Sequence, residues 1–324
     1  MMQSILQGTR SGFRNYVQVL ILAGASACSA SVIALDHGLG QPEVAGVVVD
    51  GELAEISGLA VSHHHRNVLW AINDSGNPAR LFALSTGGRK LAAFDVEGIT
   101  NVDWEDLAGF RHLGRDYLLI ADTGDNGGVR ATLDLVLIEE PQILKDARIL
   151  PARRLTFRWP DGPRDCEALA VDAARGDILL LSKKRVPAQL FRLPLAALFQ
   201  EASAATSVAQ EIAQVRALPQ PTARELQVAS RLGRYRAQIS GMSLRDDGLL
   251  AIQTYRDTYA YRRQPDQSWR QAFRAVPLPL HITVMPQPEA VAFDPRSGDL
   301  FIASERIPSP LLRLRQLSRL VPLP

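Results

Sequence analysis

The stretch DWEDLAG, residues 103–109, has four counterparts in the chain, and together they decide the fold. The counterparts are EISGLAV (55–61), DCEALAV (165–171), QISGMSL (238–244) and QPEAVAF (287–293). In each of the five, the first and third positions are polar, the fifth is aliphatic and the sixth is small. Internal self-similarity of this kind is the signature of a repeat architecture. We therefore expect five related structural units.

Each of these stretches is followed by an apolar run that ends on polar residues. The runs are VLWAINDSG (68–76), YLLIADTGD (117–125), DILLLSKKR (177–185), LLAIQTYRD (249–257) and DLFIASERI (299–307). A third strand-like piece follows each run, and a fourth strand is expected in LAAFDV (91–96), RRLTFRW (153–159) and WRQAFRAV (269–276). Continuous apolar runs are typical of strands that are covered on both faces. Short strands in units of about 50–70 residues predict an all-β fold, a β-propeller of four-stranded blades.

Five blades are expected, and a sixth in the weakly patterned region 200–237 is the alternative. An alternating βα fold is disfavoured because helical periodicity is nearly absent. The segment EVAGVVVDG (43–51) reads as a strand with no unit before it, while the last unit shows only three strands. We expect this N-terminal strand to become the fourth strand of the last blade. Closure of this kind leaves no exposed sheet edge.

Composition and charge narrow the class of protein. The chain has 324 residues, of which 46% are hydrophobic and 22% charged, and this suits one large globular domain or two small ones. Its 36 Lys and Arg face 34 Asp and Glu, and two of the cations, Arg10 and Arg14, belong to a leader, so the remainder is about neutral. Nucleic-acid binding usually needs a basic excess. No nucleic-acid partner is therefore expected.

The first 27 residues are expected to be a signal peptide, because Arg10 and Arg14 precede the apolar run YVQVLILAGASA (16–27). That run is shorter than the roughly 20 apolar residues of a membrane-spanning helix. The tetrapeptide ASAC (25–28) also resembles a bacterial lipoprotein signal, although Ala25 stands where Leu is usual. We expect a linker at 28–42, one propeller domain at 43–324, and export to the periplasm or medium. A lipid on Cys28 would anchor the protein to the outer membrane, the one membrane contact expected.

Strand polarity predicts a site. In an antiparallel blade, the first strand begins at the end where the second strand finishes. The third-column residues and the ends of the apolar runs should therefore converge around the axis, where polar groups commonly bind ligands. The alternative is a polar, water-filled channel with no further role. The residues expected to bind a small polar or anionic ligand are Asp74, Glu167, Lys183, Lys184, Tyr255, Arg256, Glu289 and Glu305.

The acidic residues of the second unit suggest a metal site. Carboxylate oxygens are hard ligands, which suit Ca²⁺ better than a soft transition metal, although the spacing is not that of an EF-hand. HHHR (63–66) could suggest zinc or nickel, but its register places it in a turn at the opposite face, where a solvated loop is the favoured interpretation. Motifs for nucleotide or redox cofactors are absent from the sequence. The expected ligands are Asp103, Glu105, Asp106, Asp122 and Asp125.

At the phrases NDSG (73–76), DWED (103–106) and DTGDN (122–126), the chain resembles a widespread group of exported bacterial β-propeller proteins. The resemblance covers roughly residues 50–310, and more distantly the pattern is similar to SdiA-regulated and phytase-like propellers. Calcium binding is known among phytase-like propellers, so the resemblance favours calcium as a cofactor here. It does not transfer a reaction, because one fold hosts many functions.

Three functions remain open at this point. The first is a binding or sensing propeller that holds a small polar or anionic ligand, with Ca²⁺ as a bridge. The second is a Ca²⁺-dependent hydrolase of phosphoesters, esters or lactones, in which the metal would activate water and the catalytic candidates Lys183 and Arg256 would stabilise negative charge. The third is a scaffold whose rim binds another protein of the cell envelope.

Overall fold

The computed structural model describes residues 41–317, apart from 201–205, 229–232, 283–284 and 316. The expected signal peptide, Cys28 and nearly all of the expected linker lie outside the described residues. Export and lipidation therefore stay predictions. In the part of the chain that is described, no helix is long and apolar enough to cross a membrane.

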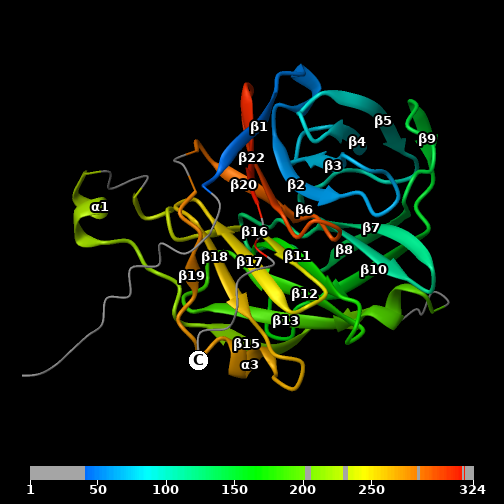
Figure 1. Cartoon of the computed structure of the whole chain (residues 1–324). Helices are drawn as coiled ribbons and strands as arrows, with labels where there is room; N and C mark the ends of the chain where they lie inside the picture. Colours follow the sequence, from blue (N-terminus) through cyan, green and yellow to red (C-terminus); the bar gives the residue numbers. More distant parts are fainter. Residues whose placement is uncertain (1–40, 201–205, 229–232, 283–284, 316, 318–324) are drawn as a thin grey trace, which may run out of the picture. The chain divides into compact units, whose positions relative to one another are not determined.

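Five sheets surround a common axis, each with one innermost strand (Figure 1). Neighbouring innermost strands contact one another around the ring, and the last of them lies against the first. The fold is therefore a five-bladed β-propeller, as the sequence predicts. The innermost strands are β2 (Ile56–Val61), β6 (Trp104–His112), β11 (Cys166–Asp172), β16 (Ile239–Leu244) and β20 (Pro288–Phe293).

Each blade adds three further strands outward from the axis. The second strands are β3 (Val68–Asn73), β7 (Arg115–Asp122), β12 (Asp177–Ser182), β17 (Leu249–Thr254) and β21 (Leu300–Ser304). The third strands are β4 (Arg80–Ser85), β8 (Leu133–Glu139), β13 (Ala188–Pro194), β18 (Thr258–Arg262) and β22 (Ser309–Leu314). The fourth strands are β5 (Lys90–Val96), β10 (Arg153–Arg158), β15 (Gln210–Val215), β19 (Leu278–Pro279) and β1 (Glu43–Val48).

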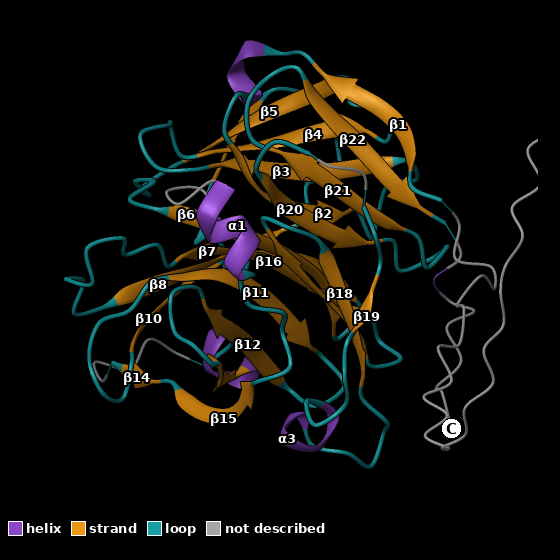
Figure 2. Cartoon of the chain, turned by 90° about the vertical axis from the view of Figure 1, so that its left-hand side faces the viewer, coloured by secondary structure: helices purple, strands orange, loops and turns teal. Residues whose placement is uncertain are grey.

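The N-terminal strand closes the ring. β1 pairs antiparallel with β22, from Glu43 opposite Arg313 to Val48 opposite Ser309, and so completes the last blade. The described part of region 200–237 adds no sixth sheet. Instead it supplies β14 (Ser207–Val208), β15 and α1 (Ala223–Val228). Figure 2 shows α1 in front of the sheets, on the face of the ring that is turned toward the viewer.

Each pair of neighbouring blades shares its own hydrophobic core. Along β3, Trp70 and Ile72 pack toward the second blade, whereas Leu69 and Ala71 pack toward the last blade. Because successive side chains of a strand point to opposite faces, a strand between two blades must be apolar at every position. This explains the unbroken apolar runs of the sequence. Full burial of one such large side chain stabilises the fold by about 1.5–3 kcal/mol.

A β-bulge interrupts each innermost strand at the third column of the sequence repeat. The antiparallel register skips one residue in four strands and two residues in β11. A bulge leaves the extra residue out of the hydrogen-bonded ladder and bends the strand. The third-column side chains are thereby released from regular strand pairing near the axis. The third-column residues are Ser57, Glu105, Glu167, Ser240 and Glu289.

The expected fourth strand at 269–276 is wrong in its first half. Trp269–Ala272 forms the short helix α3, and the fourth strand, β19, spans only Leu278–Pro279. The cause is a capping box, in which Ser268 and Gln271 satisfy each other's backbone N–H groups. The alternating pattern of WRQAFRAV does not reveal this cap.

Connections between third and fourth strands reach back to cover the preceding blade. β9 (Ala147–Ile149) pairs parallel with β5, and β14 pairs parallel with β10. α3 lies against β15 in the corresponding place on the third blade. An unpaired sheet edge invites association with other chains. These additions therefore protect the outer edges of three blades.

Candidate functional site

The chemically distinctive residues gather at one end of the channel, where the innermost strands begin and the second strands end. The register places Trp104 opposite Asp122 and Pro288 opposite Ser304. Glu105 and Glu289 therefore lie at the same end of the ring, as strand polarity predicts. We call this end the upper mouth.

The serines of the third column join neighbouring blades. The hydroxyl of Ser57 donates to the carbonyl oxygen of Trp104 at 2.7 Å, and that of Ser240 donates to the carbonyl oxygen of Pro288 at 2.7 Å. Both bonds run from one innermost strand to the next. The two serines thus hold the ring together, and the three glutamates of the column supply the charge.

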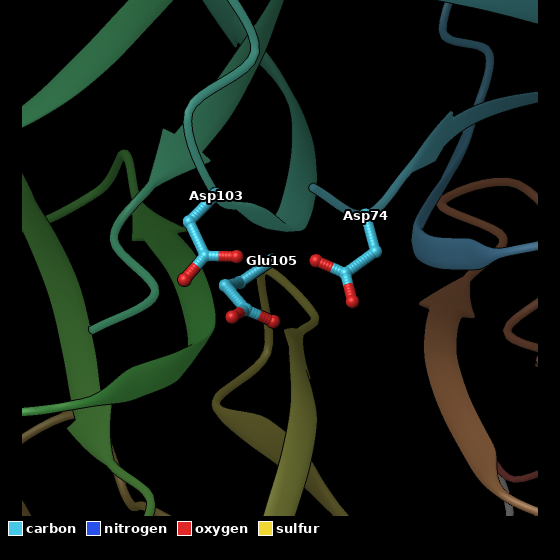
Figure 3. Close-up of side chains that lie close together, drawn as sticks. All are labelled: Asp74, Asp103 and Glu105. Carbon is cyan, nitrogen blue, oxygen red and sulfur yellow. The ribbon is translucent and has the colours of Figure 1, made fainter. Parts of the chain in front are cut away.

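Three carboxylates from the first two blades form what we call the acidic triad: Asp74, Asp103 and Glu105. Each offers an oxygen within 4.8 Å of the other two. Asp74 follows β3, Asp103 precedes β6, and Glu105 is the bulged residue of β6. Figure 3 shows the three carboxylates converging on a common space.

Asn101 fixes the relative position of the two loops that carry the triad. Its side-chain amide donates to the carbonyl oxygens of Asn73 at 3.1 Å and Asp74 at 2.8 Å, in the first blade. Its Oδ1 accepts the N–H of Trp104 at 3.0 Å, in the second blade. Asn101 is a positioning residue that the sequence does not single out, because an isolated Asn belongs to no motif.

Glu105 is the member of the triad with an unusual environment. Its residue is only 6% exposed. Among the described residues, no hydrogen-bond donor or cation is paired with its carboxylate. Burial raises the pKa of Glu105 well above its usual range, and the charge of Asp74 adds to this. Burial likewise raises the pKa of Asp103 to about 6, again with a contribution from Asp74. Crowded carboxylates of this kind must be neutralised by protons or by a bound cation.

A second carboxylate group shares Glu105 with the triad. Oxygens of Asp165 and Glu167 lie within 4.8 Å of one another and of Glu105. These two acids already have counter-ions, because Lys184 Nζ is 2.8 Å from Asp165 Oδ2 and Lys183 pairs with Glu167. Asp165 was not among the expected site residues, although it occupies the first column of the repeat in the same place as Asp103. Of these two groups, the triad is the one in which no carboxylate forms an ion pair within the described part of the chain.

Lys183, Tyr255 and Glu289 face the acids from the third, fourth and fifth blades. Lys183 Nζ is 3.2 Å from the Tyr255 hydroxyl, which donates to Glu289 Oε1 at 2.9 Å. Burial raises the pKa of Glu289 to about 8, with Glu305 as the next cause. The pKa of Tyr255 is raised by burial and by the charge of Glu289. This side of the mouth therefore holds a cation, a phenol and a carboxyl with a raised pKa of about 8.

Asp106 lies elsewhere, within the channel wall. It is fully buried and accepts backbone N–H groups from Leu107 at 2.8 Å, Leu169 at 2.7 Å and Met242 at 3.2 Å. Burial raises its pKa well above the usual range, although these three N–H groups act in the opposite direction. Because the three donors belong to the second, third and fourth blades, Asp106 ties these blades together at the axis. Neither group of potential metal ligands in the described residues includes Asp106.

Asp122 and Asp125 also have structural partners. Arg130 pairs with Asp122 at 2.7 Å. The carboxylate of Asp125 accepts the N–H groups of Val129 at 2.8 Å and Arg130 at 3.0 Å. The two acids thus shape the loop after β7. The groups of potential metal ligands found in the described residues include neither of them.

Arg256 is directed away from the mouth. Its guanidinium pairs with Glu225 in α1 at 2.6 Å and donates to the carbonyl oxygens of Pro219 and Gln220, both at 3.3 Å. It thereby fastens the segment around α1 to the fourth blade. Of the two catalytic candidates, only Lys183 lies among the acids of the upper mouth.

A cavity of about 560 Å³ lies at the other end of the innermost strands, opposite the upper mouth. Its wall includes the small residues Ala60, Ala108 and Ala170 of the innermost strands. The HHHR segment lies at this end, where the N–H groups of His63 and His64 donate to Glu140 at 3.1 and 3.4 Å. In the described part of the chain, no histidine belongs to a group of potential metal ligands.

Comparison with known proteins finds only distant structural similarity. No family model matches the sequence, and no curated protein matches it. A luciferin-regenerating enzyme is similar in structure with 11% identity and a TM-score of 0.43, over 84% of this chain and 95% of that one. Glutaminyl cyclase of Myxococcus xanthus has 14% identity and a TM-score of 0.45, over 85% of this chain and 97% of that one. Raptor of Chaetomium thermophilum has 11% sequence identity and a TM-score of 0.38, over 82% of this chain and 20% of that one.

Proposed function

We propose that this protein binds Ca²⁺ at the acidic triad and that the cation, together with Lys183, holds a small polar or anionic ligand at the upper mouth. The proposal includes export, since the leader predicts that the protein works outside the cytoplasm. The observation that carries the proposal is the environment of Glu105. Its carboxylate is buried and has no counter-ion among the residues that the structure describes, while two further carboxylates face the same space.

Burial of a charged group without a partner is costly, and the group usually gains a proton or a cation instead. The neighbouring acids show the contrast. Asp165 and Glu167 have the lysines as counter-ions, whereas the triad has none among the described residues. A divalent cation at the triad would neutralise charge where side chains do not. The triad is therefore the preferred position of the cation.

Ligand chemistry favours calcium over transition metals. All three side chains of the triad offer carboxylate oxygens, and hard oxygen ligands suit Ca²⁺, whereas imidazole and thiolate suit zinc, copper and nickel. Calcium accepts six to eight oxygen ligands. Three carboxylates leave coordination positions open, so that oxygens of a bound ligand can complete the shell.

Thermal unfolding of the full chain tests the cation site. Binding to the native state alone stabilises it by about 2.7 kcal/mol when the ligand is at about a hundredfold excess over its Kd. We expect calcium to raise the Tm by several degrees and EDTA to reverse the increase. Glu105→Gln should remove the response, whereas Glu139→Gln, at an exposed acid of β8, should retain it. A Tm that is unchanged across millimolar calcium would contradict the proposal.

A calcium-dependent hydrolase is the second candidate, favoured by the group formed by Lys183, Tyr255 and Glu289. A bound Ca²⁺ would polarise an ester or phosphoryl oxygen. Lys183 would stabilise negative charge on that oxygen, and Glu289, with its pKa of about 8, could donate a proton to a leaving group. Calcium-dependent turnover of phosphoester, ester or lactone substrates, lost in Glu289→Gln, would identify this activity. Calcium binding without turnover would leave the binding function.

A further inference from the structure

A small cleft opens beside the acids of the upper mouth. It has a volume of about 80 Å³ and lies between the turn after β12 and the segment that leads into β16. All of the titratable side chains that line it in the described chain are cationic. They are Lys183, Lys184, Arg185 and Arg234.

The two lysines connect this cleft to the cation site. Lys183 pairs with Glu167 and Lys184 with Asp165, and both of these acids have oxygens within 4.8 Å of Glu105. A single layer of carboxylates therefore separates the cationic cleft from the acidic triad.

The two arginines leave positive charge unbalanced in the cleft. Arg185 is exposed, and no side chain of the described residues pairs with it. Arg234 donates to the Tyr235 hydroxyl at 2.8 Å and lies over the Tyr235 ring at 4.8 Å, but it has no carboxylate partner in the described chain. Guanidinium groups bind carboxylates and phosphates through paired N–H donors. The free donors of these arginines therefore suit one oxyanion.

The volume limits what the cleft can hold. One water molecule takes about 30 Å³ of liquid, so the cleft replaces only two or three waters. That space suits one carboxylate or phosphate group, and the rest of a ligand must lie outside it. The neighbouring triad is the place where a second anionic group would find a cation.

We propose that the ligand is a small dianion with one oxyanion group in the cleft of Lys183, Lys184, Arg185 and Arg234 and the other on the cation at the acidic triad. This inference rests on the proposed function, because the second group needs the bound calcium. The shared chemistry is a compact oxyanion, which can be a carboxylate or a phosphate.

The test uses the full chain loaded with calcium and a set of probes: succinate and glutarate as dicarboxylates, butyrate as a monoanion, and inorganic phosphate. Calorimetry and thermal unfolding should detect binding of at least one dicarboxylate and not of butyrate, and phosphate measures the affinity of the cleft for a single oxyanion. The double variant Arg185→Ala/Arg234→Ala loses charge-assisted hydrogen bonds, so it should bind the dianion about tenfold more weakly or worse. Its calcium response should be unchanged. Arg66→Ala/Arg89→Ala, at exposed arginines remote from the cleft, is the matched control.

The outcomes separate the two claims. If calcium binds but none of the dianions does, or if the Arg185→Ala/Arg234→Ala variant binds them as tightly as the control variant, the dianion inference is overturned and the calcium site stands. If calcium itself does not bind, the proposed function and this inference fail together. Binding of phosphate without either dicarboxylate would show that the cleft holds a single oxyanion, and it would overturn the bridging dianion.

Discussion

The carboxylate of Glu105 lies against the backbone of Gly124, where a Cβ on the glycine would collide with Glu105 Oε1 and with the carboxylate of Asp103. Gly124 follows β7, so the loop after this strand packs directly on the acidic triad. A side chain at Gly124 can be accommodated only if both carboxylates move. The glycine therefore helps to determine where the triad lies.

Replacement of Gly124 by Ala should displace two of the three ligands without removing any charge. Changes in the groups that orient metal ligands typically weaken metal binding roughly 10- to 100-fold. We expect a loss of calcium affinity of that size by calorimetry. Gly127→Ala is the matched control in the same loop, because a Cβ there meets only Val129, at 3.7 Å. Equal calcium affinity for the two variants would show that Gly124 does not position the triad.

The stability of the calcium-free protein should fall as pH rises from about 5 to about 8. Asp103 has its pKa raised to about 6 and Glu289 to about 8, so the native state binds more protons than the unfolded state in this window. Stability then decreases with pH, and the contribution is lost as pH passes each raised pKa. Thermal unfolding in EDTA across this range measures the slope.

Calcium should weaken this dependence of stability on pH, because the bound cation replaces the protons at the triad. Asp103→Asn should reduce the slope in EDTA between about pH 5 and about pH 6, where Asp103 titrates. A Tm in EDTA that rises steadily from pH 5 to pH 8 would be inconsistent with the raised pKa values of these carboxyls.

Asp106→Asn should destabilise the fold without affecting calcium. The N–H groups of Leu169 and Met242 both donate to Oδ2 of Asp106. When an amide NH₂ replaces that oxygen, both buried N–H groups lose their acceptor. Each unsatisfied buried group costs about 1–3 kcal/mol, so the loss of both partners should lower the free energy of unfolding by roughly 2–6 kcal/mol in denaturant unfolding. Asp246→Asn, at an exposed aspartate, should be close to neutral. A variant with wild-type stability and no calcium response would return Asp106 to the metal site.

Lys183→Met should leave Glu167 buried without its counter-ion. Breaking a buried ion pair in this way costs about 3–5 kcal/mol, and we expect a decrease in the free energy of unfolding of that order in EDTA. Calcium should stabilise this variant more than the wild type, since another carboxylate near Glu105 is then unpaired. Arg256→Ala should leave the calcium response unchanged because Arg256 pairs with Glu225. The same calcium response in Lys183→Met and Arg256→Ala would show that Lys183 is not coupled to the cation site.

The sequence predicts the architecture because each unit of the repeat forms one blade. The five aligned stretches become the five innermost strands, and the unpaired strand at the N-terminus becomes β1. Apolar runs and turn residues report burial on both faces, which is a local property of each strand. α3 escaped prediction because the capping box of Ser268 outweighs the strand-like pattern that follows it.

The sequence predicts at which end of the ring the site residues lie, but not which of them contact one another. Strand polarity placed Glu105, Glu167 and Glu289 at one mouth, but the partner of each acid depends on distances between blades. Asp106 follows Glu105 directly, yet the bulge and the alternation of side chains send it into the channel wall. Asp165 escaped notice because its contribution arises only when the third blade packs beside the second. The position of an acid along its strand follows from the local sequence, whereas its ion-pair or hydrogen-bond partner depends on how the blades pack.

Calorimetric titration of the full chain with calcium tests the central claim most directly. We expect one Ca²⁺ per chain, with protons released at neutral pH because the pKa values of Glu105 and Asp103 are raised. Titrations in two buffers of different ionisation enthalpy measure that release. Glu105→Gln should abolish the binding, and Glu139→Gln should preserve it. Absence of binding by the wild-type protein, or equal affinity in Glu105→Gln, would contradict a calcium site at the acidic triad.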